Sequence, residues 1–148
     1  MKNTLPEFSI SLKYKSKKSE LKTITCPGDA ADVARQCFNA DTMDWVESFI
    51  VIALNQANKV LGFYKVSSGG VSATVSDPKV IFQFALLSNA SAIILAHNHP
   101  SGNLEASNAD KAMTEKIKNA SKMLDITLID HIIVTDESYT SFSQMGLL

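Results

Sequence analysis

The stretch AIILAHNHPSGNLEASNAD, Ala92–Asp110, passes from an apolar run to a polar loop within a few residues. A short apolar run that is bounded by turn residues is typical of a buried strand. Here the run leads into the sequence H-N-H, and Pro, Ser and Gly then end any regular structure. The chain therefore ends a predicted core strand with two imidazoles, and it supplies Ser107 and Asp110 shortly afterwards.

The spacing of these side chains indicates a metal site. Residues two apart in an extended segment point to the same side, so we expect His97 and His99 to project together and Asn98 to face away. Asp110, in the first turn of the next predicted helix, can fold back over the intervening turn and supply a carboxylate. Two imidazoles and one carboxylate, without a thiolate, leave a fourth tetrahedral position for water. This pattern is typical of a catalytic rather than a structural zinc ion.

Other interpretations of the same residues remain open. Ser107-x-x-Asp110 also matches a helix capping box, in which the two side chains bond to the start of a helix. Histidines at strand ends often bond only to carbonyl groups or to solvent. The two roles of Ser107 are compatible, because a capping serine can still expose its hydroxyl to a cleft.

Two further ionisable residues bear on the chemistry. Hydrolysis by activated water needs a base, and Glu47 is the candidate because it stands at the start of an otherwise apolar predicted strand. An exposed carboxylate at a strand end is the alternative. His131 follows Asp130 in LIDHIIVT and could replace Asp110 as a third ligand, but we expect it to support the other ligands instead.

The rest of the chain indicates one soluble domain. Its 148 residues are 45% hydrophobic and 20% charged, and the net charge of -1 favours neither nucleic acid nor an anionic membrane as a partner. No apolar run has the length of a transmembrane span, and the first residues lack the apolar core of a signal peptide. Cys26 and Cys37 lack metal-binding spacing, so we expect reduced cysteines and a cytoplasmic location.

Hydrophobic periodicity and turn residues predict a mixture of strands and helices. The early strands come as hairpins, which favours an α/β fold with a mixed sheet sandwiched by helices. Residues 1–25 are expected to form a lysine-rich leader with an edge strand, and residues 26–148 the domain itself. The predicted strands are 7–15, 45–55, 59–67, 71–75, 91–97 and 126–135, and the predicted helices are 26–38, 76–89 and 107–125.

The combined residues resemble a known motif. Glu47, the run HNHP at 97–100, Ser107 and Asp110 are similar to the JAMM motif of JAB/MPN metalloproteases. HNHPSG together with DHIIV resembles the RadC-like branch of that family, and the resemblance covers roughly residues 43–148. It implies a JAB/MPN architecture, which is like that of cytidine deaminases.

The resemblance also implies roles for individual residues. His97, His99 and Asp110 would hold Zn²⁺, Glu47 would be the general acid and base, and Ser107 would stabilise the oxyanion. The expected function is therefore that of a zinc metallopeptidase that hydrolyses a peptide or isopeptide bond in a protein or peptide substrate. A non-catalytic module that binds protein or nucleic acid is the alternative, although the near-neutral charge does not support DNA binding.

Overall fold

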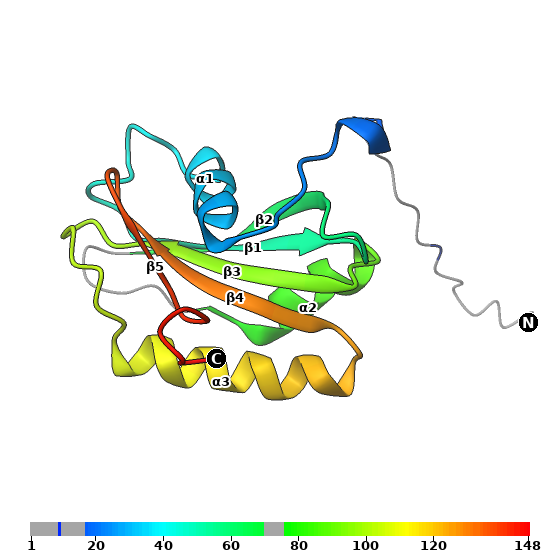
Figure 1. Cartoon of the computed structure of the whole chain (residues 1–148). Helices are drawn as coiled ribbons and strands as arrows, with labels where there is room; N and C mark the ends of the chain where they lie inside the picture. The colour runs from blue at the N-terminus through cyan, green and yellow to red at the C-terminus, as the bar shows by residue number, and fades with distance from the viewer. Residues whose placement is uncertain (1–8, 10–16, 70–75) are drawn as a thin grey trace, which may run out of the picture.

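A single mixed sheet organises the protein (Figure 1). The computed structural model describes residue 9 and residues 17–69 and 76–148, and within these ranges the strand order is β2-β1-β3-β4-β5. β3 and β4 run parallel, and the other neighbouring strands pair antiparallel. The strands are β1 (Ser48–Leu54), β2 (Val60–Ser68), β3 (Ala92–Asn98), β4 (Thr127–Val134) and β5 (Tyr139–Ser141).

Helices cover both faces of this sheet. α1 (Pro27–Cys37) packs on one face, whereas α2 (Pro78–Leu87) and α3 (Asn108–Met123) pack on the other (Figure 1). A short 3₁₀ turn, Lys18–Glu20, precedes α1. The arrangement confirms the predicted α/β class, with a mixed sheet sandwiched by helices.

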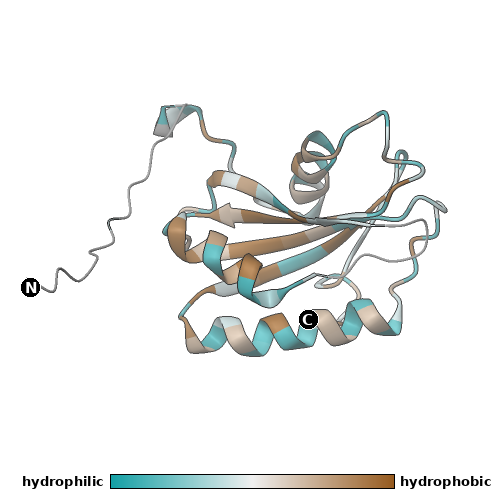
Figure 2. Ribbon diagram, turned by 180° about the vertical axis from the view of Figure 1, so that it is seen from behind, coloured by the Kyte–Doolittle hydropathy of each residue, from teal (hydrophilic) through white to brown (hydrophobic). Residues whose placement is uncertain are grey.

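The two central strands, β1 and β3, are buried along their whole length. Strands that are covered on both faces become nearly continuous hydrophobic runs, as their sequences are here and as the brown central strands in Figure 2 show. Alternate side chains of β3 pack into two hydrophobic cores, one on each face of the sheet. Ile94 and Ala96 pack towards α1, and Ile93 and Leu95 pack towards α2 and α3.

The connection from β3 to β4 positions the predicted site. Two parallel strands need a crossover connection, and α3 supplies it. The loop between β3 and α3 turns sharply where the Gly102 N–H donates to the His99 carbonyl (3.0 Å). Gly102 has φ 77°, a left-handed conformation that glycine adopts without steric cost. The start of α3 is thereby returned to the end of β3.

The structure corrects one boundary of the predicted strands and adds one strand that was not predicted. The strand predicted at 45–55 begins only at Ser48, because the Val46 carbonyl accepts from the Asn98 side chain (2.8 Å) and not from a neighbouring strand. Trp45 is 59% exposed. β5 was not predicted, because three residues are too few to show a period. The strands predicted at 7–15 and 71–75 lie outside the described residues.

The cysteines lie at the two ends of α1. Cys26 directly precedes the helix, and Cys37 is its last residue and is half-buried. The Cys37 thiol donates to the Val33 carbonyl (3.1 Å), and burial raises the pKa of this thiol to about 11. Cys37 is therefore a protonated packing residue at neutral pH. No helix in the described part of the chain is long and apolar enough to cross a membrane.

The buried strands predict which side chains the domain needs for its stability. Ile94→Ala should lower the free energy of unfolding by about 2–5 kcal/mol, because the side chain is fully buried between β3 and α1. Leu86→Ala is the matched control, and it should change stability by no more than about 0.5 kcal/mol, because Leu86 is 57% exposed. Urea unfolding of both variants measures the difference, and equal losses would contradict the assigned core.

Candidate metal centre

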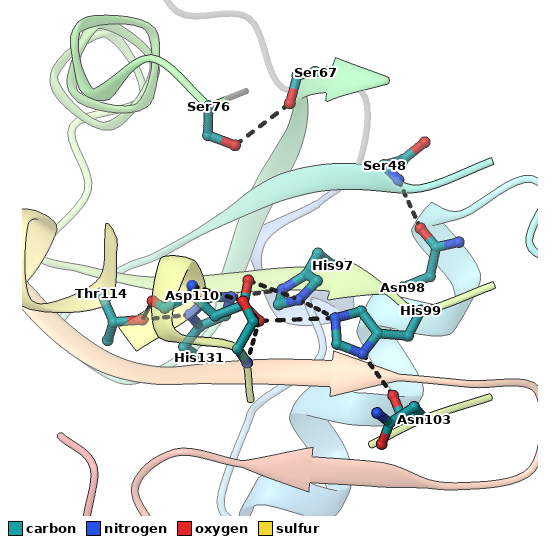
Figure 3. Close-up of polar contacts among 11 residues, drawn as sticks. Ser48, Ser67, Ser76, His97, Asn98, His99, Asn103, Asp110, Thr114 and His131 are labelled. Carbon is teal, nitrogen blue, oxygen red and sulfur yellow. Dashed lines mark hydrogen bonds and ion pairs between the residues drawn. The ribbon is translucent and has the colours of Figure 1, made fainter. Parts of the chain in front are cut away.

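All three histidines of the chain meet at one end of the sheet (Figure 3). His97 is on β3, His99 follows that strand, and His131 is on the neighbouring β4. The His97 ring stacks on Phe49, with ring centroids 5.8 Å apart. The His131 ring stacks on Phe142 at 4.5 Å. Both buried imidazoles are therefore held between neighbouring strands and aromatic rings.

The three predicted ligands lie close together. The Nε2 atoms of His97 and His99 lie 2.9 Å apart, and Asp110 Oδ1 lies 3.3 Å from His97 Nε2. Asp110 Oδ2 lies 3.8 Å from His99 Nε2. The His97 side chain is almost fully buried, whereas those of His99 and Asp110 are each 15% exposed, so the group is open on one side.

A chain of hydrogen bonds fixes the protons of the buried rings. The Thr114 hydroxyl donates to the Asp110 backbone carbonyl (2.6 Å), so its oxygen accepts from His131 Nδ1–H (2.6 Å). Burial lowers the pKa of His131 well below its ordinary value, which keeps this ring neutral. His131 Nε2 therefore accepts from His97 Nδ1–H (2.8 Å). His97 Nε2 is left with a lone pair.

His99 also has its proton on Nδ1, but a different contact holds it there. Its Nδ1–H donates to the Asn103 backbone carbonyl in the loop before α3. Its Nε2 lone pair therefore faces the Nε2 of His97 and the carboxylate of Asp110. In this arrangement two lone pairs and a carboxylate converge, all within 4.8 Å of one another. A cation is the group that satisfies such a set of acceptors.

The spacing also fits a tetrahedral metal ion. Two ligands at about 2.0–2.1 Å from one tetrahedral ion lie about 3.3 Å apart. The observed separations of 2.9, 3.3 and 3.8 Å bracket that value. The residues present therefore fit a metal ion held by His97, His99 and Asp110, while neither nitrogen of His131 is available for it.

Asp110 has two roles at once. Its Oδ2 accepts from the backbone N–H of Ser107 (2.8 Å) and from the Ser107 hydroxyl (2.7 Å), while the Asp110 N–H donates to Ser107 Oγ (3.1 Å). This is the capping box that the sequence predicted for the start of α3. Partial burial raises the pKa of the Asp110 carboxyl, but the contacts with His97 and Ser107 outweigh burial and hold this pKa well below its usual value.

Glu47 directly precedes β1, the strand that pairs with β3. The β1–β3 pairing ends with Phe49 opposite His97, so Glu47 comes two residues before this pair and His99 two residues after it. Glu47 is half-buried, and within residues 17–69 and 76–148 nothing bonds to its carboxylate. Its catalytic role, like that of Ser107, stays a prediction.

Three supporting groups were not found from the sequence. Thr114 lies four residues after Asp110 on α3, a spacing that could have placed it under the site. Asn98 is buried on the opposite side of β3, and an amide in a buried strand signals a need for partners. The Asn103 contact is made by a backbone carbonyl, for which the sequence carries no signal.

Comparison with known proteins agrees with this geometry. The family model described as the RadC-like JAB domain matches residues 24–147. A UPF0758 protein of Flavobacterium johnsoniae is 44% identical over 101 residues, which are 68% of this chain and 44% of that protein. A UPF0758 protein of Salinibacter ruber is 39% identical over 129 residues, or 87% of this chain and 54% of that protein.

The chain therefore belongs to the family of RadC-like JAB domains, as its motifs predicted, and its mixed sheet between helices agrees with the JAB/MPN fold. The UPF0758 protein YfjY of Escherichia coli is 40% identical over 102 residues, which are 69% of this chain and 64% of that protein. The chain thus spans about half the length of the relatives it matches. The family includes metallohydrolases, but the names of these relatives state no activity.

The hydrogen-bond chain predicts that Thr114 supports metal binding without touching the metal. Thr114→Val keeps the shape of the side chain but leaves His131 Nδ1–H without its acceptor. The affinity for cobalt(II), titrated through its visible absorption, should fall by about 10- to 100-fold, the usual effect of losing an outer hydrogen bond.

Thr127→Val is the matched control, because Thr127 is exposed at the start of β4 and away from the histidines. This control should bind cobalt(II) as the unchanged protein does. An undiminished affinity in Thr114→Val would show that the proton chain does not prepare His97 for a metal.

Proposed function

We propose that this domain is a zinc-dependent hydrolase of the JAMM type that cleaves a peptide or isopeptide bond. The observation that carries the proposal is the convergence of His97 Nε2, His99 Nε2 and the Asp110 carboxylate as three acceptors. The outer nitrogens, Nδ1 of His97 and Nδ1 of His99, are occupied by His131 and by the Asn103 carbonyl, so Nε2 is the nitrogen that each ring offers to a metal.

Zinc is the metal that this donor set favours. Imidazole nitrogens suit zinc and other late transition metals, whereas magnesium and calcium prefer oxygen ligands throughout. Three protein ligands with one open side are typical of catalytic zinc sites, and structural sites are closed by four. When bound, zinc supplies a Lewis acid that polarises a carbonyl group and makes water a nucleophile near neutral pH.

Glu47 is the proposed proton carrier. Its carboxylate accepts the proton of the attacking water and delivers it to the leaving amine nitrogen, so that the C–N bond breaks with a neutral amine. Its place two residues before the Phe49–His97 pair, and its lack of other partners in the described ranges, support this role.

Ser107 is the proposed donor to the oxyanion that forms on the substrate carbonyl. Its hydroxyl is bonded to Asp110 Oδ2 (2.7 Å), so it must turn towards the substrate. The turn is inexpensive, because Oδ2 keeps the bond from the Ser107 backbone N–H (2.8 Å). The same residue can therefore cap α3 and serve the reaction.

The substrate is proposed to be a protein or peptide, and the site of action the cytoplasm, where the two unpaired cysteines stay reduced. His99 lines a surface pocket with Pro100 and Gly102, which offers room for a substrate chain beside this ligand. The RadC-like family match and the ligand geometry together favour this enzyme over a module that only binds a partner.

Replacing the base and a ligand should have different effects. Glu47→Gln preserves shape and should keep one zinc ion per chain, while turnover falls by at least ~10²-fold. Asp110→Ala removes a ligand and should lose zinc, as well as about 1 kcal/mol of helix stability from the capping box. Zinc content by elemental analysis and cleavage of a panel of fluorogenic peptides and isopeptides measure both effects.

Loss of zinc from Glu47→Gln would make Glu47 a ligand and overturn the assignment of roles. Unchanged turnover in that variant would remove the catalytic role and favour the interaction module. Absence of zinc from the unchanged protein, even after refolding with zinc, would overturn the proposed function as a whole.

Ser107→Ala should retain zinc and lower kcat more than it raises KM, because the lost hydroxyl acts on charge that develops in the transition state. Thermal unfolding should report the loss of the cap separately, at about 1 kcal/mol. A rise in KM with kcat unchanged would assign Ser107 to substrate binding instead.

A further inference from the structure

Asn98 lies between the two proposed histidine ligands, yet its side chain points to the opposite face of β3 (Figure 3). It is 1% exposed. Its Nδ2 donates to the carbonyls of Met43 (2.7 Å) and Val46 (2.8 Å), and its Oδ1 accepts from the Ser48 N–H (2.8 Å). All three partners are backbone groups of one short segment before and at the start of β1. The amide therefore uses both donor hydrogens and its oxygen on that segment.

The clamped segment is the one that carries Glu47. The Val46 carbonyl belongs to the peptide group before Glu47, and the Ser48 N–H belongs to the peptide group after it. One buried side chain thus holds both peptide groups that set the direction of the Glu47 side chain. A third bond, from the Gly69 N–H to the Glu47 carbonyl (2.9 Å), holds the peptide group after Glu47 from the end of β2.

We propose that Asn98 is the positioning residue for Glu47, and that it fixes the base relative to the metal ligands. The proposal rests on the proposed function, because it needs Glu47 to face the metal. His97 and His99 flank Asn98 in the chain, so the end of β3 and the residue after it set the place of both histidine ligands and, through Asn98, of the base.

The chemistry of the segment explains why this residue is an asparagine. Two carbonyl oxygens and one N–H need two donors and one acceptor from a single short side chain, and an asparagine amide supplies this set. A serine has one donor, and an aspartate would turn a carboxylate oxygen towards two carbonyls. A substitution therefore frees the segment, although it leaves the metal ligands on the other face untouched.

The test measures the position of Glu47 with cobalt(II) as the probe. Paramagnetic shifts fall steeply with distance from the ion, and carbon-13 in glutamate carboxyl groups reports them. The Glu47 signal is assigned by its disappearance in Glu47→Gln. In Asn98→Ser the paramagnetic shift of Glu47 should fall by about half or more, because the freed segment samples several positions. The cobalt(II) dissociation constant should stay within about threefold.

Two references separate positioning from general damage. The Glu105 and Glu115 signals should keep their paramagnetic shifts in Asn98→Ser, which shows that the ion has not moved. Asn55→Ala removes another asparagine that bonds to the backbone, since Asn55 Oδ1 accepts from the N–H groups of Ala57 and Lys59 at the far end of β1. This control should leave the Glu47 shift unchanged. On any peptide that the unchanged protein cleaves, Asn98→Ser should lose about 10²-fold in kcat.

The outcomes distinguish this inference from the proposed function. Failure of the unchanged protein to bind cobalt(II) overturns the proposed function, and a bound ion with no paramagnetic shift at Glu47 overturns the role of the base and of Asn98 together. An unchanged Glu47 shift in a metal-loaded Asn98→Ser overturns the inference alone. If Asn98→Ser does not fold, Ser48→Pro removes the bonding N–H at the first residue of a strand, where proline is tolerated, together with the contact between Ser48 Oγ and Ser68 Oγ (3.1 Å). It should give the same loss of shift, and Ser48→Ala, which removes only the contact with Ser68, should not.

Discussion

The site depends on one chain of buried hydrogen bonds, which runs from the Asp110 carbonyl through Thr114 and His131 to His97. Each bond has its direction set by the one before it, and the last leaves the His97 Nε2 without a proton. Metal ligands in proteins commonly have their outer nitrogen fixed in this way, which sets the ring orientation and the tautomer. Here the chain of hydrogen bonds starts at the backbone carbonyl of Asp110, the residue in the first turn of α3 that also supplies the carboxylate ligand. Ligand placement and ligand protonation therefore come from one structural unit.

That unit exists because β3 and β4 are parallel neighbours joined through α3. The crossover brings the first turn of α3 to the end of β3, and it also places His131 on β4 beside His97. The positive end of a helix favours a carboxylate in its first turn, so Asp110 is stabilised there before any metal binds. The fold thus supplies a site at one end of a rigid sheet, and the loop between β3 and α3 adds His99 and the Asn103 carbonyl that orients it.

The sequence predicted what depends on local spacing. Side-chain alternation along β3 correctly placed His97 and His99 on one face, and the S-x-x-D pattern correctly predicted the capping box at Ser107. Contacts between segments that are distant in the sequence could not be predicted from local spacing. The Asn98 amide donates to the Val46 carbonyl, so β1 begins only at Ser48. The pattern of residues 45–47 gives no sign of this contact. The contacts of Thr114 with His131 and of the Asn103 carbonyl with His99 depend equally on how α3 and its preceding loop fold back.

The central claim is that the protein presents two Nε2 lone pairs and a carboxylate to one metal ion. Long-range proton–nitrogen NMR of the imidazole rings tests it directly, since the chain has only three histidines. With one equivalent of zinc, His97 and His99 should coordinate through Nε2 and keep their Nδ1 protons, and His131 should remain neutral, protonated at Nδ1 and uncoordinated. Coordination through His131, through Nδ1 of His97, or through no histidine at all would contradict the account.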